Sequence, residues 1–239
     1  MFNERTYTIL ELTLKEFIGN GKPVSSKQLT KKYKLGVKDA TIRAELNNLT
    51  EAGFLSQPHI SGGRVPTDKG YQFIVNFAMK NLISSVGLVN KHMNQLTNIL
   101  LNRDLNNFID GFSQEMNLLG AGYENSTSNF YKSGLGELFE NLELETKNDF
   151  YEIAKDFERL DEKFKALPRL LNNHSGPQIF IGEKSPITQS RHLAVIIDEY
   201  NIDGDKFYIA AIGPKRMDYQ KNLKFFKQIK ETYERKRKK

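Results

Sequence analysis

Three short amphipathic segments separated by tight turns occupy residues 7–18, 27–33 and 39–52, and they limit the possible folds more than any other feature of the chain. In each segment the apolar side chains recur near a 3.6-residue period, which predicts an amphipathic helix. Gly36, between the second and third segments, can take the positive φ that a sharp reversal needs. Two helices joined by such a turn, after a supporting first helix, are the parts of a helix-turn-helix.

The third segment divides into a buried and an outward face. Ile42, Leu46 and Leu49 fall at i, i+4 and i+7 and therefore share the buried face. The side chains left on the outward face are Lys38, Thr41, Arg43, Ala44 and Asn47. The DNA major groove admits a helix of this diameter. A three-helix bundle with solvated charges would show the same spacing.

The outward face carries side chains suited to duplex DNA. Arg43 can donate two hydrogen bonds to a guanine edge, and Asn47 can pair with adenine. Lys38 and Thr41 can hold phosphates, which position a protein on the duplex. We therefore predict that this face reads DNA.

A β-hairpin is predicted directly after the third helix. Residues 54–57 and 65–67 have the pattern of short strands, and the loop over residues 58–64 contains two glycines and Arg64. A hairpin in this place is the wing of a winged helix. We expect the two glycines to let the backbone approach DNA closely and Arg64, at the tip, to contact a neighbouring groove or a phosphate.

Charge is segregated along the chain, whose formal net charge is +6. Residues 1–80 carry +5, residues 81–220 carry −6 and residues 221–239 carry +7. A basic segment suits a polyanion, because neutralising phosphates releases condensed counterions. Lysine-rich surfaces that only aid solubility would give the same imbalance.

Beyond residue 82 the pattern predicts a mixture of helices and strands. Helices are expected over residues 83–119, 149–167 and 219–235, with a loop over 120–136. Strands are expected over residues 178–181, 192–200 and 207–212. Pro168 is expected to end the middle helix.

The helix over residues 149–167 carries a regular apolar seam. Its members, spaced by three and four residues, are Phe150, Ile153, Phe157, Leu160, Phe164 and Leu167. Such spacing is typical of a coiled coil and could form a dimer seam. Because the stretch is shorter than three heptads, a face that covers the chain's own sheet is the favoured interpretation.

Several runs of the chain resemble one family. Residues 57–71, Gln-Pro-His-Ile-Ser-Gly-Gly-Arg-Val-Pro-Thr-Asp-Lys-Gly-Tyr, closely resemble the HrcA heat-inducible transcription repressors. Shorter matches to the same family cover residues 23–27, 41–43, 49–55, 181–187 and 211–219. The sequence departs from the family at Ala44, where the family usually has Asn.

The resemblance implies an α+β fold in three parts. It implies an N-terminal winged helix-turn-helix over residues 1–82, then a helical linker or dimerisation region over 83–120. A shortened GAF-like domain with a basic tail is expected over 121–239. The candidate DNA contacts are Ser26, Lys27, Lys38, Thr41, Arg43, Asn47, Arg64 and Lys69.

The function implied by the resemblance is heat-inducible repression. A homodimer would bind a double-stranded inverted-repeat operator, the CIRCE element, upstream of chaperone genes. Heat stress would release it, with the GroE chaperonin as a partner that keeps the repressor active. The alternatives are a winged-helix regulator that senses a small ligand, and a module whose winged helix binds protein or structured RNA.

Nothing in the residue pattern points to an enzyme. The chain has no cysteine, and its four histidines form no metal-ligand or catalytic spacing, so no cofactor or metal is expected. No apolar run approaches the ~18–20 residues that span a bilayer. We expect a soluble cytoplasmic protein without a membrane partner.

Overall fold

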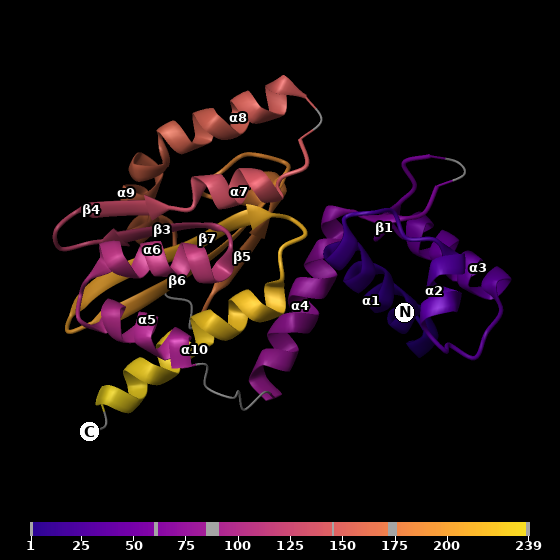
Figure 1. The fold of residues 1–239 in the computed structure, drawn as a ribbon, viewed down its shortest axis with the longest axis horizontal. Helices are drawn as coiled ribbons and strands as arrows, with labels where there is room; N and C mark the ends of the chain where they lie inside the picture. Colours follow the sequence, from indigo (N-terminus) through magenta and orange to yellow (C-terminus); the bar gives the residue numbers. More distant parts are fainter. Residues whose placement is uncertain (1, 60–61, 85–90, 145, 172–175, 238–239) are drawn as a thin grey trace. The chain divides into compact units, whose positions relative to one another are not determined.

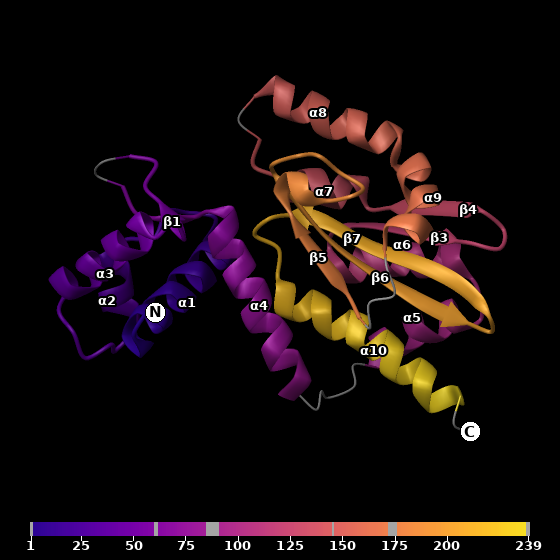
Figure 2. The same ribbon diagram turned by 180° about the vertical axis from the view of Figure 1, so that it is seen from behind.

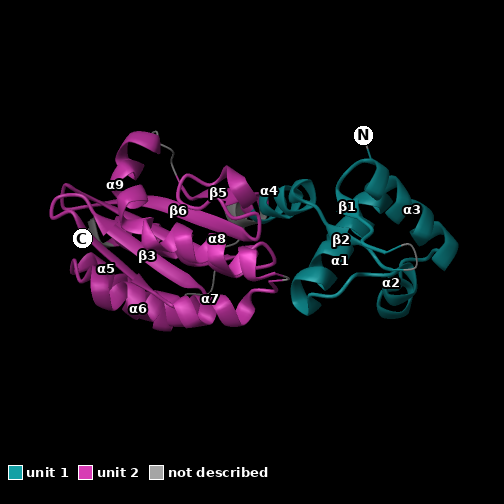
Figure 3. Ribbon diagram, turned by 90° about the horizontal axis from the view of Figure 1, so that it is seen from above, with its two compact units in different colours: residues 1–78 teal, residues 79–239 magenta. Residues whose placement is uncertain are grey.

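The computed structural model describes residues 2–59, 62–84, 91–144, 146–171 and 176–237. The chain forms two compact units, Met1–Ala78 and Met79–Lys239, each with its own apolar core (Figure 3). Within the described ranges, every helix is too short or too polar to cross a membrane.

The first unit contains the helices and the hairpin that the sequence predicts, in the same order (Figure 1). Its elements are α1 (Glu4–Asn20), α2 (Ser26–Lys32), α3 (Asp39–Glu51), β1 (Leu55–Ser56), β2 (Val65–Pro66) and α4 (Asp68–Ser84), which continues past the boundary. Gly21 ends α1 with φ 65°, and Gly36 makes the turn before α3 with φ 68°. Ser25 caps α2 by accepting a hydrogen bond from the backbone N–H of Gln28.

One face of each of the first three helices is apolar and lies in a shared core. The buried members of this core are Ile9, Leu10, Leu14, Val24, Leu29, Ile42, Leu46, Leu49 and Leu55. The predicted buried face of α3 is therefore confirmed. Because that face is fixed in the core, the opposite face of α3 must point outward.

A buried carboxylate joins α1 to α2. Glu16 is 4% exposed, pairs with the Lys32 Nζ at 2.7 Å and accepts a hydrogen bond from the Tyr33 hydroxyl at 2.5 Å. These two partners lower the pKa of Glu16, and the carboxylate in turn raises the pKa of Tyr33 to about 12. The end of α2, from which the turn into α3 begins, is thus held to α1 by these two bonds.

A five-stranded antiparallel sheet lies at the centre of the second unit, with strand order β4-β3-β7-β6-β5. Its strands are β3 (Leu119–Glu124), β4 (Asn129–Ser133), β5 (Gln178–Ile181), β6 (Leu193–Ile202) and β7 (Asp205–Pro214). The three strands predicted in the last third of the chain are confirmed. Asp203 and Gly204, both at positive φ, form the tight turn between β6 and β7.

Helices cover both faces of this sheet (Figures 1 and 2). One face packs against α8 (Lys147–Glu158) and α9 (Leu160–Leu170), with Leu138 of α7 (Leu135–Asn141) in the same core. The other face lies under α5 (Lys91–Leu101), α6 (Leu105–Met116) and α10 (Tyr219–Arg237). The second unit is therefore a three-layer arrangement of helix, sheet and helix.

The sequence predicts a loop over residues 120–136, and this prediction is wrong. The segment forms β3 and β4, and β3 is an inner strand of the sheet. Its glycines are explained by packing, because a Cβ on Gly120 would lie 2.9 Å from Phe112 and one on Gly122 would lie 2.8 Å from Leu105. Glycine here lets α6 lie close to the strand. The second unit is therefore richer in strands than the sequence suggests.

Residues 83–120 do not stand apart as a linker. Within this range α5 and α6 pack inside the second unit, α5 against α10 and α6 against β3. Apolar side chains explain the difference, since Leu100, Phe108 and Phe112 are completely buried there. The predicted helix over residues 85–90 lies outside the described residues.

The predicted helix over residues 149–167 is two helices. Arg159 ends α8 and starts α9, with φ −111° and ψ 18°, outside the helical range. Pro168 does not end α9, which continues to Leu170. The single amphipathic pattern survives the break because both helices turn the same apolar seam toward the sheet.

Candidate nucleic-acid interface

The outward face of α3 is accessible in the first unit. Lys38, Arg43 and Asn47 are exposed, and Thr41 is half-buried. The Arg43 side chain is 62% exposed and pairs with Asp39, one helical turn earlier, at 3.2 Å. An exposed i, i+4 pair of this kind contributes only a few tenths of a kcal/mol. Arg43 therefore remains available to a ligand.

The hairpin is fastened to the segment that precedes α2. The Val24 N–H donates to the Arg64 carbonyl at 2.9 Å, and the Arg64 N–H donates to the Val24 carbonyl at 2.8 Å. Gly63 lies so close to this segment that a Cβ would be 2.6 Å from the Val24 carbonyl carbon and 2.7 Å from that of Pro23. The expectation that Gly63 serves an approach to DNA is therefore corrected: this glycine is required by the chain's own backbone.

Arg64 does not lie free at the tip of the hairpin. It is 9% exposed, and its guanidinium donates to the Asn47 Oδ1 at 2.5 Å, the Thr50 Oγ1 at 3.0 Å and the Gly62 carbonyl at 3.5 Å. Burial lowers the pKa of Arg64 from its ordinary value. The predicted phosphate contact is therefore a side chain that joins the hairpin to α3, while residues 60–61 of the predicted wing loop lie outside the described residues.

Of the remaining predicted contacts, some are exposed, and others are buried or bonded within the chain. Lys27 is exposed, whereas Ser26 is only 6% exposed. The Lys69 Nζ donates to the Ala52 carbonyl at 2.8 Å and lies 4.3 Å from the centre of the Phe54 ring. Lys69 therefore covers the end of α3 and is not a free cation beside Arg43.

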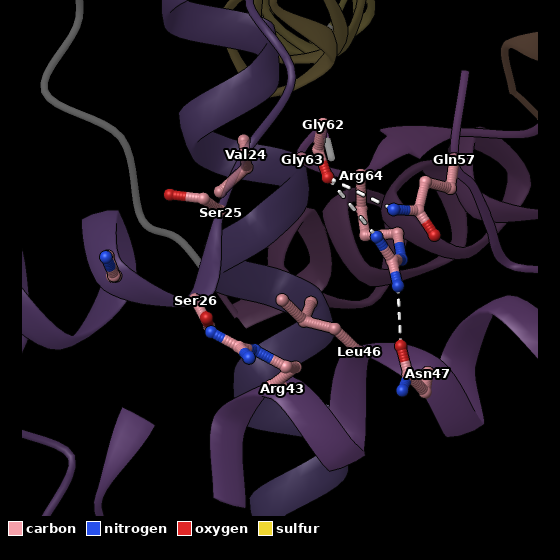
Figure 4. A pocket seen from close by; sticks show the side chains of 11 residues that line it. Val24, Ser25, Ser26, Arg43, Leu46, Asn47, Gln57, Gly62, Gly63 and Arg64 are labelled. Carbon is pink, nitrogen blue, oxygen red and sulfur yellow. Dashed lines mark hydrogen bonds between the residues drawn. The ribbon is translucent and has the colours of Figure 1, made fainter. Parts of the chain in front are cut away.

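These elements enclose a polar pocket of about 530 Å³ between the start of α2, α3 and the hairpin (Figure 4). Five of the eight predicted DNA contacts line this pocket together: Ser26, Lys27, Arg43, Asn47 and Arg64. Lys38, Thr41 and Lys69 do not line the pocket. Sequence reasoning missed Thr50 and Gln57, which hold Arg64 and the Gly62 carbonyl. A Thr one turn beyond Asn47 on the same helix was the available signal for Thr50.

The apolar seam is part of the second unit's own core. Five of its six members are at most 4% exposed and pack against the sheet: Ile153, Phe157, Leu160, Phe164 and Leu167. Phe150 departs from the others, because it is 51% exposed and contacts the ring of Phe139 at 4.9 Å. These five residues cover the chain's own sheet, as the favoured interpretation expects, and a dimer seam would need them to be exposed.

A second polar groove, of about 820 Å³, lies beside the junction of α8 and α9. Three of its charged side chains are paired within the chain, Asp156 with Lys163 at 2.6 Å and Arg159 with Glu162 at 2.8 Å. Among the residues that the structure describes, no three His, Cys, Asp or Glu side chains gather as a metal site requires. The surface around α3 is thus the stronger candidate for a functional site.

Comparison with known proteins places these observations in a family. The model described as "HrcA protein C terminal domain" matches residues 72–223. A protein named heat-inducible transcription repressor HrcA from Chloroflexus aggregans is 49% identical over 77 residues, 32% of this chain and 20% of that protein. Its namesake from Chlorobium phaeobacteroides is 44% identical over 78 residues, 33% and 22% of the two chains. The match thus spans about a fifth of each relative's length.

A solved structure has the same fold over nearly the whole chain. It is a crystal structure described only as that of a hypothetical protein, with a TM-score of 0.78 and 16% sequence identity. The alignment covers 98% of both chains. At this identity the likeness concerns the fold alone.

Proposed function

The chain belongs to the HrcA family, and from this premise we propose that it is a heat-inducible transcription repressor whose first unit is a winged-helix DNA-binding domain. The observation that carries the proposal is the exposed face of α3, with Arg43 and Asn47 beside a polar pocket that the hairpin closes. A helix with such a face fits the major groove. Residues 1–80, with a net charge of +5, suit a polyanionic partner.

The operator and the assembly follow from the same proposal. A two-fold dimer reads an inverted repeat, because each copy places one recognition helix in one half-site. We propose the CIRCE-like repeat upstream of chaperone genes as the target, release on heat stress as the regulation, and the GroE chaperonin as the partner that maintains the active state. The relatives' printed name, heat-inducible transcription repressor, supports the regulation. The second unit, with its antiparallel sheet between helices, is proposed as the GAF-like effector domain.

A footprint tests the function directly. The purified chain is bound to the chaperone promoters of its own genome and treated with DNase before and after brief heating. We expect a protected inverted repeat that becomes accessible on heating. A footprint that ignores temperature but responds to metabolites would favour the ligand-sensing regulator instead, and preference for ribosomal RNA over the promoter duplex would contradict DNA repression.

Arg43 provides the matched mutational test of the same surface. Arg43→Ala is expected to weaken operator binding by about 1–3 kcal/mol relative to random duplex, if the guanidinium reads a base edge. The control is Arg5→Ala, because Arg5 is exposed on α1 and does not line the pocket. Fluorescence anisotropy with both duplexes measures the ratio. An unchanged ratio for Arg43→Ala would remove Arg43 from base recognition.

A further inference from the structure

The contact between Arg64 and Asn47 joins two residues that sequence reasoning assigned separately to DNA. Asn47 is exposed on α3, and Arg64 reaches it from the hairpin, 17 positions further along the chain. The 2.5 Å bond is among the short ones in the first unit. A guanidinium held in this way has little freedom to reach a phosphate.

The orientation of the Asn47 amide follows from the chemistry of its partner. A guanidinium has five N–H donors and no acceptor, so only the carbonyl oxygen of an amide can face it. The Asn47 Oδ1 therefore points at Arg64, and the NH₂ group points away from it (Figure 4). A free asparagine on a helix surface would exchange these two orientations.

Both the backbone and the guanidinium of Arg64 are held by hydrogen bonds, so the side chain can hold Asn47 in place. Its backbone is paired with Val24, and its Nε donates to the Thr50 Oγ1 at 3.0 Å. The Thr50 hydroxyl in turn donates to the Leu46 carbonyl at 2.8 Å. Because the guanidinium is planar, the Nε and Nη2 bonds together determine where the fork points. The group is thus organised before any ligand arrives.

We infer that Arg64 is a positioning residue for DNA reading: it orients the Asn47 amide so that the N–H donors face the base edges. This inference rests on the proposed DNA-binding function. Outward donors match an acceptor edge, such as O6 and N7 of guanine or O4 of thymine. The two-bond pairing with adenine also uses the Oδ1, whose second lone pair can still accept while the first accepts from Arg64. Asn47 therefore presents its donors to a base that offers an acceptor at this position in the operator.

Salt dependence separates positioning from phosphate contact. In the full chain, Arg64→Met should lower the ratio of operator to random-duplex affinity about fivefold or more, with an unchanged slope of log K against log [salt]. A phosphate contact would instead weaken both duplexes alike and reduce the slope by about one. That outcome would overturn the inference. The matched control is Lys27→Met, an exposed cation of the same pocket, for which the phosphate pattern is expected.

Two further variants guard against a trivial loss of structure. Arg64→Lys keeps the charge but not the planar fork, so it should lower the ratio as Arg64→Met does. Asn47→Asp keeps an acceptor for Arg64 and removes the donors, so it should lower the ratio while the melting temperature is maintained. Full operator preference in Asn47→Asp would contradict the role given to the donors.

A measurement without DNA tests the positioning by itself. In the wild-type chain the ¹⁵N heteronuclear NOE of the Asn47 side-chain amide should be high, and it should fall in Arg64→Met. An equal NOE in both would overturn the inference whatever the DNA data show. If instead the wild-type chain shows no preference for operator over random duplex, the proposed function fails, while the NOE still reports on the Arg64–Asn47 contact.

Discussion

Gly63 is a residue of the first unit where a side chain has almost no room. A methyl group there would meet the backbone of Pro23 and Val24, which cannot rotate away. We expect Gly63→Ala to lower the free energy of unfolding by about 1–3 kcal/mol, the usual cost of overpacking. Hydrogen exchange measured by mass spectrometry should show faster exchange of the Val24 and Arg64 amides.

The control for this change is Gly19→Ala. Gly19 lies in α1 with no atom from outside its own helix turn within 4 Å of its missing Cβ, so alanine should be neutral or slightly stabilising. Equal exchange rates in the Gly63→Ala and wild-type chains would show that the hairpin can move away from Val24.

Asp198 is a carboxyl group buried in the second unit, where its ionised form is unfavourable. It is 5% exposed on β6, and burial raises its pKa to about 6. The Glu199 N–H and the charge of Lys230 act in the opposite direction and lower this pKa, but by less than burial raises it. Because this pKa exceeds the ordinary 3.8, the cost of ionisation is absent below about pH 4 and complete above about pH 6. Asp198→Asn should therefore raise the free energy of unfolding at pH 8 by about 1–3 kcal/mol and leave it unchanged at pH 4.

Urea unfolding followed by circular dichroism at pH 4, 6 and 8 measures this difference. Asp161→Asn serves as the control, because its carboxylate is 44% exposed in a surface pair with Lys165 and should show little pH-dependent effect. A stabilisation of Asp198→Asn that is the same at all three pH values would mean that the carboxyl group is not the cause.

The positions of single residues were predictable where a local pattern fixes them. The faces of α3 follow from spacing, so Ile42 is buried and Arg43 is exposed as predicted. The partner of Arg64 was not predictable, because a contact between a hairpin and a helix leaves no period in the sequence. Lys69 was misjudged for the same reason, since its bond to the Ala52 carbonyl depends on how two elements meet.

At the scale of elements, the seam of α8 and α9 shows what an amphipathic pattern can and cannot determine. Phe157 is 4% exposed in the core beneath the sheet. We expect Phe157→Ala to lower the free energy of unfolding by about 3–5 kcal/mol, as removal of a buried ring does. Tyr151→Ala is the control on the same helix, because its 64% exposed ring should change stability by less than about 0.5 kcal/mol.

Sedimentation beside the unfolding experiment separates the two interpretations of the seam. The Phe157→Ala chain should keep the oligomeric state of the wild type wherever it remains folded. Unchanged stability together with dissociation would restore the dimer seam. The pattern predicted the buried side of the helices correctly, but a period cannot say whether the covering surface is the chain's own sheet or a second copy.

Strands β3 and β4 were predicted as a loop, because amino-acid composition alone does not show which residues pack against a neighbouring helix. Gly120 and Gly122 lower strand propensity, and a run rich in Gly, Ser and Asn is typical of loops. In the fold these glycines face α6, where Phe112 and Leu105 fill the space that their side chains would take. The reason for the glycines lies in an element that the sequence does not show to be adjacent.

At the scale of the whole molecule, the division into two units is itself testable. The first unit has its own core, closed by Leu55 of the hairpin and Val24 before α2. We expect a fragment of residues 1–84 to unfold cooperatively on heating and to keep its preference for an operator half-site. If the second unit joins the two copies of the proposed dimer, the fragment's affinity for the full inverted repeat should fall, because two linked copies no longer bind together.

A shorter fragment of residues 1–53 is the matched control. It lacks the hairpin, so Val24 loses its partner Arg64 and the core loses Leu55, and no cooperative transition is expected. Cooperative unfolding of both fragments would show that the hairpin contributes nothing to the core. Absence of a transition in residues 1–84 would mean that the first unit depends on the second.

The strand order β4-β3-β7-β6-β5 has a consequence for how the protein is made. A ribosome releases β3 long before its neighbour β7, so the nascent chain carries an open strand edge until nearly the last residues emerge. The first unit can complete its fold while the sheet of the second is still incomplete. Newly translated copies therefore pass through a stage in which only the first unit has its native form.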